Sequence, residues 1–278
     1  HIETLQRKGR KVHRWAARGE ALPDTGTFVV PTVIEIEGLG DLQREVFGPV
    51  LHFVRYRREA LDELLAAINA TGYGLTMGLH TRIDETIDRV ATASRAGNLY
   101  VNRNMVGAVV GVQPFGGEGL SGTGPKAGGP LYLYRLLAER PGGALARAMG
   151  SASTSPERAS LPMPALAALQ AWAGSQHHRA LGDACQRFAA QVPAGTHVEL
   201  PGPTGERNVY ALQARRHVLC LAADPADLLL QLAAVLAVGG QAVWEQARRS
   251  LLEGLPEAVR EQVVLVSDPF DPAVPLDA

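Results

Sequence analysis

The feature that most constrains this chain is a glycine-rich stretch, Gly97–Pro130, in which ten of 34 residues are glycine. Glycine loses more conformational freedom on folding than other residues, so this density indicates positive φ angles or a close backbone approach. A flexible linker is the alternative, but linkers usually lack aromatic residues, and this stretch contains Tyr100 and Phe115. We therefore predict an ordered loop whose backbone N–H groups face a small, anionic ligand.

Bulk properties limit the classes that remain. A length of 278 residues favours two domains, and 46% hydrophobic residues can supply a core. A net charge of −1 gives no indication of nucleic acid or of an anionic membrane surface as a partner. Two cysteines favour a reducing cytoplasm without a disulfide framework. Because the chain begins at His1 inside a helical pattern, we expect a fragment of a longer protein.

Alternating strands and helices predict an α/β layer with a partly parallel sheet in the first half. One helix should bury Leu61, Leu65 and Ile68, and the next Ile83, Val90 and Ala91, because these apolar residues recur at helical spacing. The predicted helices are His1–Lys8, Arg58–Asn69 and Ile83–Ser94, and the predicted strands are Thr27–Ile34, Val50–Val54, Leu75–His80 and Leu99–Val101.

The second half predicts a further α/β domain. Pro164–Val192 is an Ala-rich helical region, and two strands form a hairpin around the Gly202–Asn208 turn. A strand, an apolar helix and a Gly-Gly stop at Gly239 then lead to another strand. Adjacent His177 and His178 point about 100° apart on a helix, so a metal site is not expected there. The remaining predicted strands are Thr196–Leu200, Val209–Leu212, Val218–Ala222, Gln241–Trp244 and Val263–Val266.

Five motifs occur in the order and spacing of the aldehyde dehydrogenase superfamily, which the first half therefore resembles. The stretch Val106–Gln113 resembles the branch that acts on glutamate semialdehyde. More narrowly, the whole chain resembles the C-terminal end of long, bifunctional flavoenzymes of proline catabolism, which carry an extra C-terminal domain. The five motifs are Phe28–Thr32, Glu45–Val50, Asn69–Leu75, Gly97–Asn102 and Pro114–Gly117.

The resemblance implies the domain organisation. Residues 1–138 would be the C-terminal part of an aldehyde dehydrogenase catalytic domain, with an oligomerisation strand or flap at Pro130–Leu137. Residues 139–160 would be a linker, and residues 161–278 a Rossmann-like domain with an extended tail. That domain lacks a Gly-x-Gly-x-x-Gly motif, and Glu245 or Gln246 stands near the position of the family's ribose-binding lysine. We expect that it no longer binds a dinucleotide.

The resemblance also implies site residues. Glu45 would accept hydrogen bonds from the nicotinamide ribose of NAD, and Phe47 would pack beside the nicotinamide. Gly107 and Ala108 would offer backbone N–H groups to the substrate's α-carboxylate, and Phe115 would line its aliphatic part. From the residues alone, a solvated surface turn remains open for Glu45, and core packing remains open for Phe115.

The family's cysteine nucleophile would lie upstream, so no catalytic residue and no metal ligand is expected in this chain. Cys185 and Cys220 have apolar or helical surroundings, which favours structural thiols. The implied parent oxidises L-glutamate γ-semialdehyde to glutamate with NAD, and FAD belongs to its proline dehydrogenase domain outside this chain. The fragment alone should be inactive.

The expected partners are the rest of the parent polypeptide, a small-molecule substrate and further copies in a homo-oligomer, without nucleic acid. A peripheral membrane contact of the parent stays open. Two other functions also stay open. One is a non-catalytic Rossmann-like module for small-molecule binding or oligomerisation, and the other is a part of a different aldehyde dehydrogenase.

Overall fold

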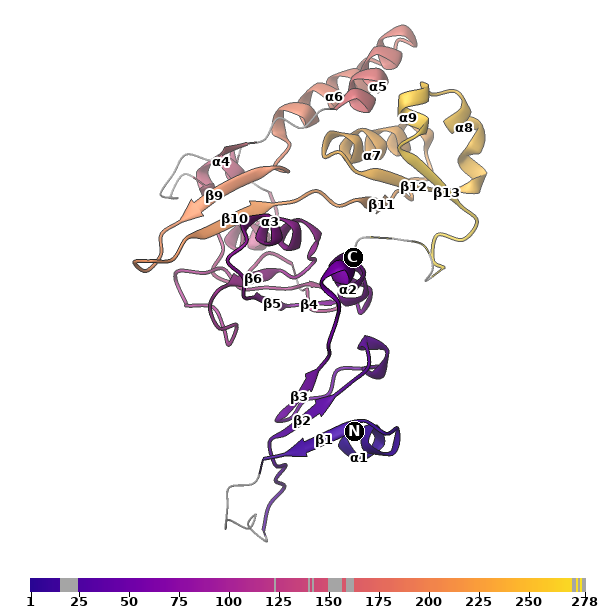
Figure 1. Ribbon diagram of the computed structural model, residues 1–278. Helices are drawn as coiled ribbons and strands as arrows, with labels where there is room; N and C mark the ends of the chain where they lie inside the picture. Colours follow the sequence, from indigo (N-terminus) through magenta and orange to yellow (C-terminus); the bar gives the residue numbers. More distant parts are fainter. Residues whose placement is uncertain are drawn as a thin grey trace. The chain divides into compact units, whose positions relative to one another are not determined.

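The computed structural model describes residues 1–15, 25–122, 124–139, 141, 143–149, 157–158, 163–271, 274 and 276. The chain divides into two compact units, residues 1–104 and 105–278, which are described separately below (Figure 1). In the described residues, no helix combines the length and the apolar character that crossing a membrane requires.

The first unit opens with helix α1 (Ile2–Arg7) and a sheet of β1 (Lys11–Arg14), β2 (Thr32–Glu35) and β3 (Val50–Phe53). Strand β2 is central, antiparallel to β1 and parallel to β3. Helix α1 is followed by a glycine C-cap, since Gly9 has φ +80° and the Arg10 N–H bonds to the carbonyl of Leu5 at 3.0 Å. Leu5, Ile34 and Ile36 form a small buried core.

The strand predicted from Thr27 begins only at Thr32. Pro31 has no N–H to donate to a ladder, and the first bond to the β3 side runs from the Thr32 N–H to the Pro49 carbonyl at 2.9 Å. Phe28 and Val29 are about half exposed, at 54% and 49%.

A second pair of strands completes the first unit. Strands β5 (Thr76–Leu79) and β6 (Asn98–Val101) pair in parallel, which confirms the predicted parallel arrangement. The Asn69 side chain links helix α2 (Leu61–Ala70) to the end of helix α3 (Asp84–Ala93). Its amide donates to the Ala93 carbonyl at 2.8 Å and accepts from the Arg95 N–H at 3.0 Å. The other elements are η1 (Leu39–Asp41), η2 (Arg58–Ala60), α2 (Leu61–Ala70), β4 (Tyr73–Gly74) and α3 (Asp84–Ala93).

Helix α3 is shorter than predicted and is turned slightly from the expected face. Val90 is buried, but Ala91 is exposed, and Ile83 precedes the helix in extended conformation with 43% exposure. The prediction that Ile83 and Ala91 point inward was therefore wrong.

The second unit begins within the glycine-rich stretch, which contains β7 (Glu118–Gly119) and is followed by the 3-10 helix η3 (Leu133–Leu136). The segment Pro130–Leu137, predicted as an oligomerisation strand or flap, therefore contains a short helical turn and not a strand. The hairpin of β9 (Thr196–Leu200) and β10 (Asn208–Leu212) forms as predicted, and β8 (Glu157–Arg158) adds to its other edge.

Two helices replace the single helical region predicted at Pro164–Val192. Helices α5 (Pro164–Ser175) and α6 (Arg179–Gln191) are separated at His177, which has φ +60°. His178 stacks on Trp172 with ring centroids 5.5 Å apart. Both histidines are exposed, and neither belongs to a metal cluster in the described part of the chain.

The end of the second unit is the predicted Rossmann-like arrangement. Strands β11 (His217–Leu219), β12 (Gln241–Glu245) and β13 (Val263–Val266) form a parallel sheet in that order. Helix α7 (Pro225–Ala237) connects β11 to β12 and lies beside them in Figure 1. The connection from β12 to β13 adds η4 (Gln246–Arg248), α8 (Arg249–Glu253) and α9 (Glu257–Arg260).

Half of the predicted linker at 139–160 and part of the C-terminal tail lie outside the described residues. The linker contains a short helix, α4 (Ala144–Met149). In the tail, Phe270 is 75% exposed.

Candidate functional site: an ordered glycine loop

The glycine-rich stretch is an ordered loop closed by a backbone bridge. The N–H of Phe115 bonds to the carbonyl of Ala127 at 3.0 Å, and the reverse bond measures 2.8 Å. Lys126 Nζ donates to the Gly116 carbonyl at 2.6 Å. A Cβ on Gly116 would lie 3.1 Å from the Cα of Lys126, so glycine permits the close approach. The linker alternative does not fit these contacts.

The predicted carboxylate-binding backbone lies in an open part of this loop. Gly107 and Ala108 are half-buried, and a Cβ built on Gly107 meets no atom within 4 Å. The neighbouring Val106 and Val110 are 94% and 97% exposed. Gly111 turns the chain with φ +81°. A small ligand can therefore reach the main chain at this point.

Gln113 organises the loop, although the sequence gives it no individual role. Its Oε1 accepts a hydrogen bond from the Val109 N–H at 3.0 Å. Its Nε2 donates to Glu206 at 3.0 Å and to Asn208 Oδ1 at 3.1 Å. These partners lie more than 90 residues away, and no local pattern could indicate the contact.

Charged groups around Lys126 support the base of the loop. Burial lowers the pKa of the Lys126 ammonium, and the nearby Glu118 carboxylate opposes that shift. Glu118 also forms an ion pair with Arg215, with Nη1 and Oε2 3.0 Å apart. The ion pair with Arg215 ties the loop to the segment between β10 and β11 of the same unit.

The two residues predicted to bind the cofactor lie between η1 and β3. Glu45 is exposed, and Phe47 is 88% exposed. Gly48 follows with φ +154°, a value that favours glycine. Glu45 and Phe47 belong to the first unit, whereas Gly107, Ala108 and Phe115 belong to the second. The convergence of these five residues therefore stays a prediction.

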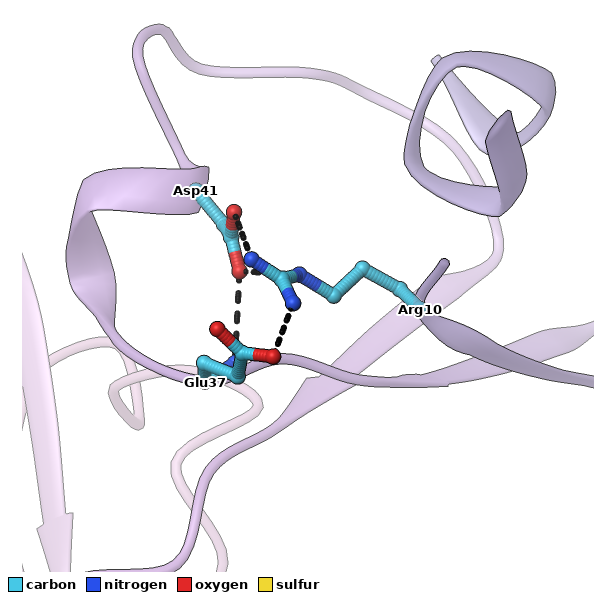
Figure 2. A network of polar contacts seen from close by, with 3 residues as sticks. All are labelled: Arg10, Glu37 and Asp41. Carbon is cyan, nitrogen blue, oxygen red and sulfur yellow. Dashed lines mark hydrogen bonds and ion pairs between the residues drawn. The ribbon is translucent and has the colours of Figure 1, made fainter. Parts of the chain in front are cut away.

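A polar network fixes the segment just before Glu45 (Figure 2). Arg10 Nη2 donates to Asp41 Oδ1 at 3.0 Å, its Nε lies 2.7 Å from Asp41 Oδ2, and it also pairs with Glu37. The Arg10 hydrogen bond holds the pKa of the Asp41 carboxyl below its ordinary value. The two-point contact joins η1 to the turn after α1, where both side chains are mostly buried.

At the carboxyl edge of the parallel sheet, where such folds bind nucleotides, three of the chain's own side chains bond to the backbone after β11. Asp224 accepts from the N–H groups of Ala226 and Asp227 at the start of α7, at 2.8 and 3.3 Å. Gln231 Oε1 accepts from the Ala222 N–H at 3.2 Å. Arg248 donates to the carbonyl of Ala223 at 2.9 Å.

Both cysteines are buried, in agreement with the sequence. Cys185 lies on α6 with no exposed surface, and Cys220 directly follows β11 with 4% exposed. Burial raises the pKa of each thiol. A nucleophilic cysteine requires an accessible thiolate, so neither side chain has the surroundings of a catalytic residue.

Comparison with known proteins finds relatives both of the first half and of nearly the whole chain. Residues 1–138 match the aldehyde dehydrogenase family. The chain is 55% identical over 290 residues to the bifunctional protein PutA of Salmonella typhimurium, an alignment that covers 99% of this chain and 22% of that protein. It is 44% identical over 136 residues to 1-pyrroline-5-carboxylate dehydrogenase of Bacillus pumilus, covering 48% of this chain and 25% of that protein.

A solved structure of PutA from Corynebacterium freiburgense shares the fold. It covers 89% of this chain and 26% of the PutA chain, with a TM-score of 0.58 and 24% sequence identity.

The family follows from these matches. Residues 1–138 belong to the aldehyde dehydrogenase family, a class of oxidoreductases. Over nearly its whole length, the chain is homologous to the bifunctional PutA proteins, and it spans about a fifth of the length of the curated PutA relatives.

Proposed function

We propose that this chain is part of an NAD-dependent L-glutamate γ-semialdehyde dehydrogenase of proline catabolism. In that reaction, the aldehyde formed from proline through pyrroline-5-carboxylate is oxidised to glutamate. The names of the relatives, PutA and 1-pyrroline-5-carboxylate dehydrogenase, support this substrate. The observation that carries the proposal is the open main chain at Gly107 and Ala108, within the residues that match the family.

In this proposal the loop recognises the substrate by its amino-acid end. The N–H groups of Gly107 and Ala108 donate to the α-carboxylate, and hydrogen bonds to a charged acceptor are stronger than neutral ones. The lack of a side chain at Gly107 lets the carboxylate approach the backbone. The partly buried Phe115 lines the aliphatic carbons of the aldehyde.

NAD accepts the hydride in this proposal, and the chain contributes only one side of its site. The exposed Glu45 carboxylate can accept hydrogen bonds from both ribose hydroxyls. The exposed ring of Phe47 offers an apolar face beside the nicotinamide. The nucleophilic cysteine and the FAD of the proline dehydrogenase reaction belong to other parts of the parent, so this chain alone is inactive.

We further propose that residues 161–278 serve as a lid or assembly domain, after a linker at 139–160. Side chains of the domain itself occupy backbone N–H groups at the carboxyl edge of its parallel sheet, which supports the expectation that it does not bind a dinucleotide. Titration of the 278-residue chain with NAD should give no saturable binding in the micromolar range. Saturable binding would instead favour an independent Rossmann-like binding module.

Exposed apolar surface supports the remaining proposed partners. Val33, Leu51 and Phe53 lie on the same face of the β2–β3 pair and are exposed, and we infer that the rest of the catalytic domain covers them. Leu133 and Leu136 on η3 are 71% and 72% exposed, which supports a homo-oligomer contact. Two unpaired cysteines support a cytoplasmic location.

Gly107→Val in the full-length parent tests the carboxylate role. The site has room for the side chain, so the variant should fold but block the approach of a carboxylate. We expect kcat/KM for glutamate semialdehyde to fall about a hundredfold, the equivalent of two charge-assisted hydrogen bonds, with pentanal oxidation little changed. Gly38→Val, at another open glycine, is the matched control. Equal loss for both aldehydes would contradict the carboxylate role.

A further inference from the structure

We propose that Gln113 is a positioning residue for the carboxylate-binding backbone, and that Glu206 and Asn208 of the C-terminal hairpin hold Gln113 in place. The inference rests on the proposed function, because it assigns a supporting contact to the same loop. It also gives the C-terminal domain a specific task in substrate recognition.

The loop side of the contact fixes a single peptide segment. Gln113 Oε1 accepts from the N–H of Val109 at 3.0 Å, and the Gln113 N–H donates to the carbonyl of Val109 at 2.9 Å. Both main-chain groups of Val109 are thus held by one residue. The Val109 N–H shares a peptide plane with the Ala108 carbonyl, so the contact fixes the chain on the C-terminal side of Ala108, next to the N–H groups proposed to bind the carboxylate.

The hairpin side uses the other end of the same amide. Gln113 Nε2 donates to the carboxylate of Glu206 at 3.0 Å and to Asn208 Oδ1 at 3.1 Å. Asn208 is the first residue of β10 and pairs with Leu200 in the hairpin, so its position follows from the sheet. The acceptor oxygens therefore come from a turn and a strand that are fixed independently of the loop.

Gly202 allows this arrangement. A Cβ at Gly202 would lie 2.2 Å from Asn208 Nδ2 and 3.8 Å from a methyl carbon of Val112. Any side chain at position 202 would displace Asn208 from the loop. The hairpin turn is thus shaped to receive the loop, and a loop that is ordered before the substrate arrives binds it with a smaller entropic loss.

Steady-state kinetics of the full-length parent test the inference. In Gln113→Ala, we expect KM for glutamate semialdehyde to rise about tenfold, with kcat/KM for pentanal within twofold of the parent value. A residue that only stabilised the fold would lower the rate with both aldehydes. The matched control is Arg207→Ala, which removes the exposed Arg207–Glu199 ion pair on the same hairpin and should change neither value.

Moving the carboxylate from Glu206 to position 113 gives a second test. Gln113→Glu places a carboxylate opposite Glu206, and we expect a larger rise in KM than for Gln113→Ala. Adding Glu206→Gln restores one donor and one acceptor, and KM should return to within about threefold of the parent value. If the double variant is no better than Gln113→Glu, the proposed contact is refuted.

The two proposals fail in different ways. If Gly107→Val impairs glutamate semialdehyde selectively and Gln113→Ala does not, the positioning role is wrong while the carboxylate site stands. If Gly107→Val has no selective effect, the carboxylate site itself is wrong.

Discussion

The sheet of β11, β12 and β13 and the sheet of β1, β2 and β3 differ in the size of the buried core beside them. Among the described residues, the main cluster around β11–β13 contains 21 buried apolar residues, whereas the cluster beneath β1–β3 contains three. In the region around β11–β13, helices α5, α6 and α7 pack together over the core. In the region of β1–β3, Leu51 on β3 is 62% exposed. The region around β11–β13 therefore has the buried core of a whole domain. The region of β1–β3 has the small core and exposed apolar face of a part of a larger domain.

The largest effect should come from a cavity in the region around β11–β13. Leu232 on α7 has no exposed surface, so Leu232→Ala should lower the free energy of unfolding by about 2–5 kcal/mol. Denaturant unfolding of the 278-residue chain, followed by tryptophan fluorescence, measures the change because Trp172 and Trp244 lie in this region. Leu221→Ala, at a residue that is 48% exposed, is the control. Equal changes for both leucines would contradict the dense core.

A smaller effect should follow from backbone packing in the same region. A Cβ on Gly240 would lie 2.6 Å from the Arg215 carbonyl oxygen, so Gly240→Ala should destabilise by about 1–3 kcal/mol. Gly182→Ala is the matched control, because that glycine lies within α6 with nothing within 4 Å. It should stabilise the chain by about 0.5–1 kcal/mol. If both variants change the unfolding free energy in the same direction, the backbone at the start of β11 and β12 can move apart at little cost.

A substitution on the exposed face of β1–β3 should affect stability differently in the 278-residue chain and in the full-length parent. Leu51→Thr should change the unfolding free energy of the 278-residue chain by less than about 0.5 kcal/mol, because the side chain is already exposed. In the full-length parent it should cost about 1–3 kcal/mol, since we propose that the face is buried there. Thermal unfolding of both lengths makes the comparison. A small change in both would show that the face stays exposed.

The sequence predicts most elements whose cause is local. The end of the first helix near Lys8 and the stop of α7 at Gly239 depend on neighbouring residues, and the structure confirms both. The fold class follows from the order of these elements. Misplaced boundaries have local reasons as well, such as the missing N–H of Pro31 before β2.

Long-range contacts set the limit of such prediction. The contact of Gln113 with Glu206 joins residues 93 positions apart. The interruption between helices α5 and α6 at His177 is accompanied by the stacking of His178 on Trp172. At the candidate site, the glycine pattern indicates an ordered, open backbone. It cannot indicate which distant side chain holds that backbone.

The most direct test of the central claim is a crystal structure of the full-length parent with bound glutamate, the proposed product. The account predicts that the α-carboxylate oxygens lie about 2.7–3.2 Å from the backbone nitrogens of Gly107 and Ala108. A glutamate whose α-carboxylate is held by other groups, with this loop out of reach, would contradict it.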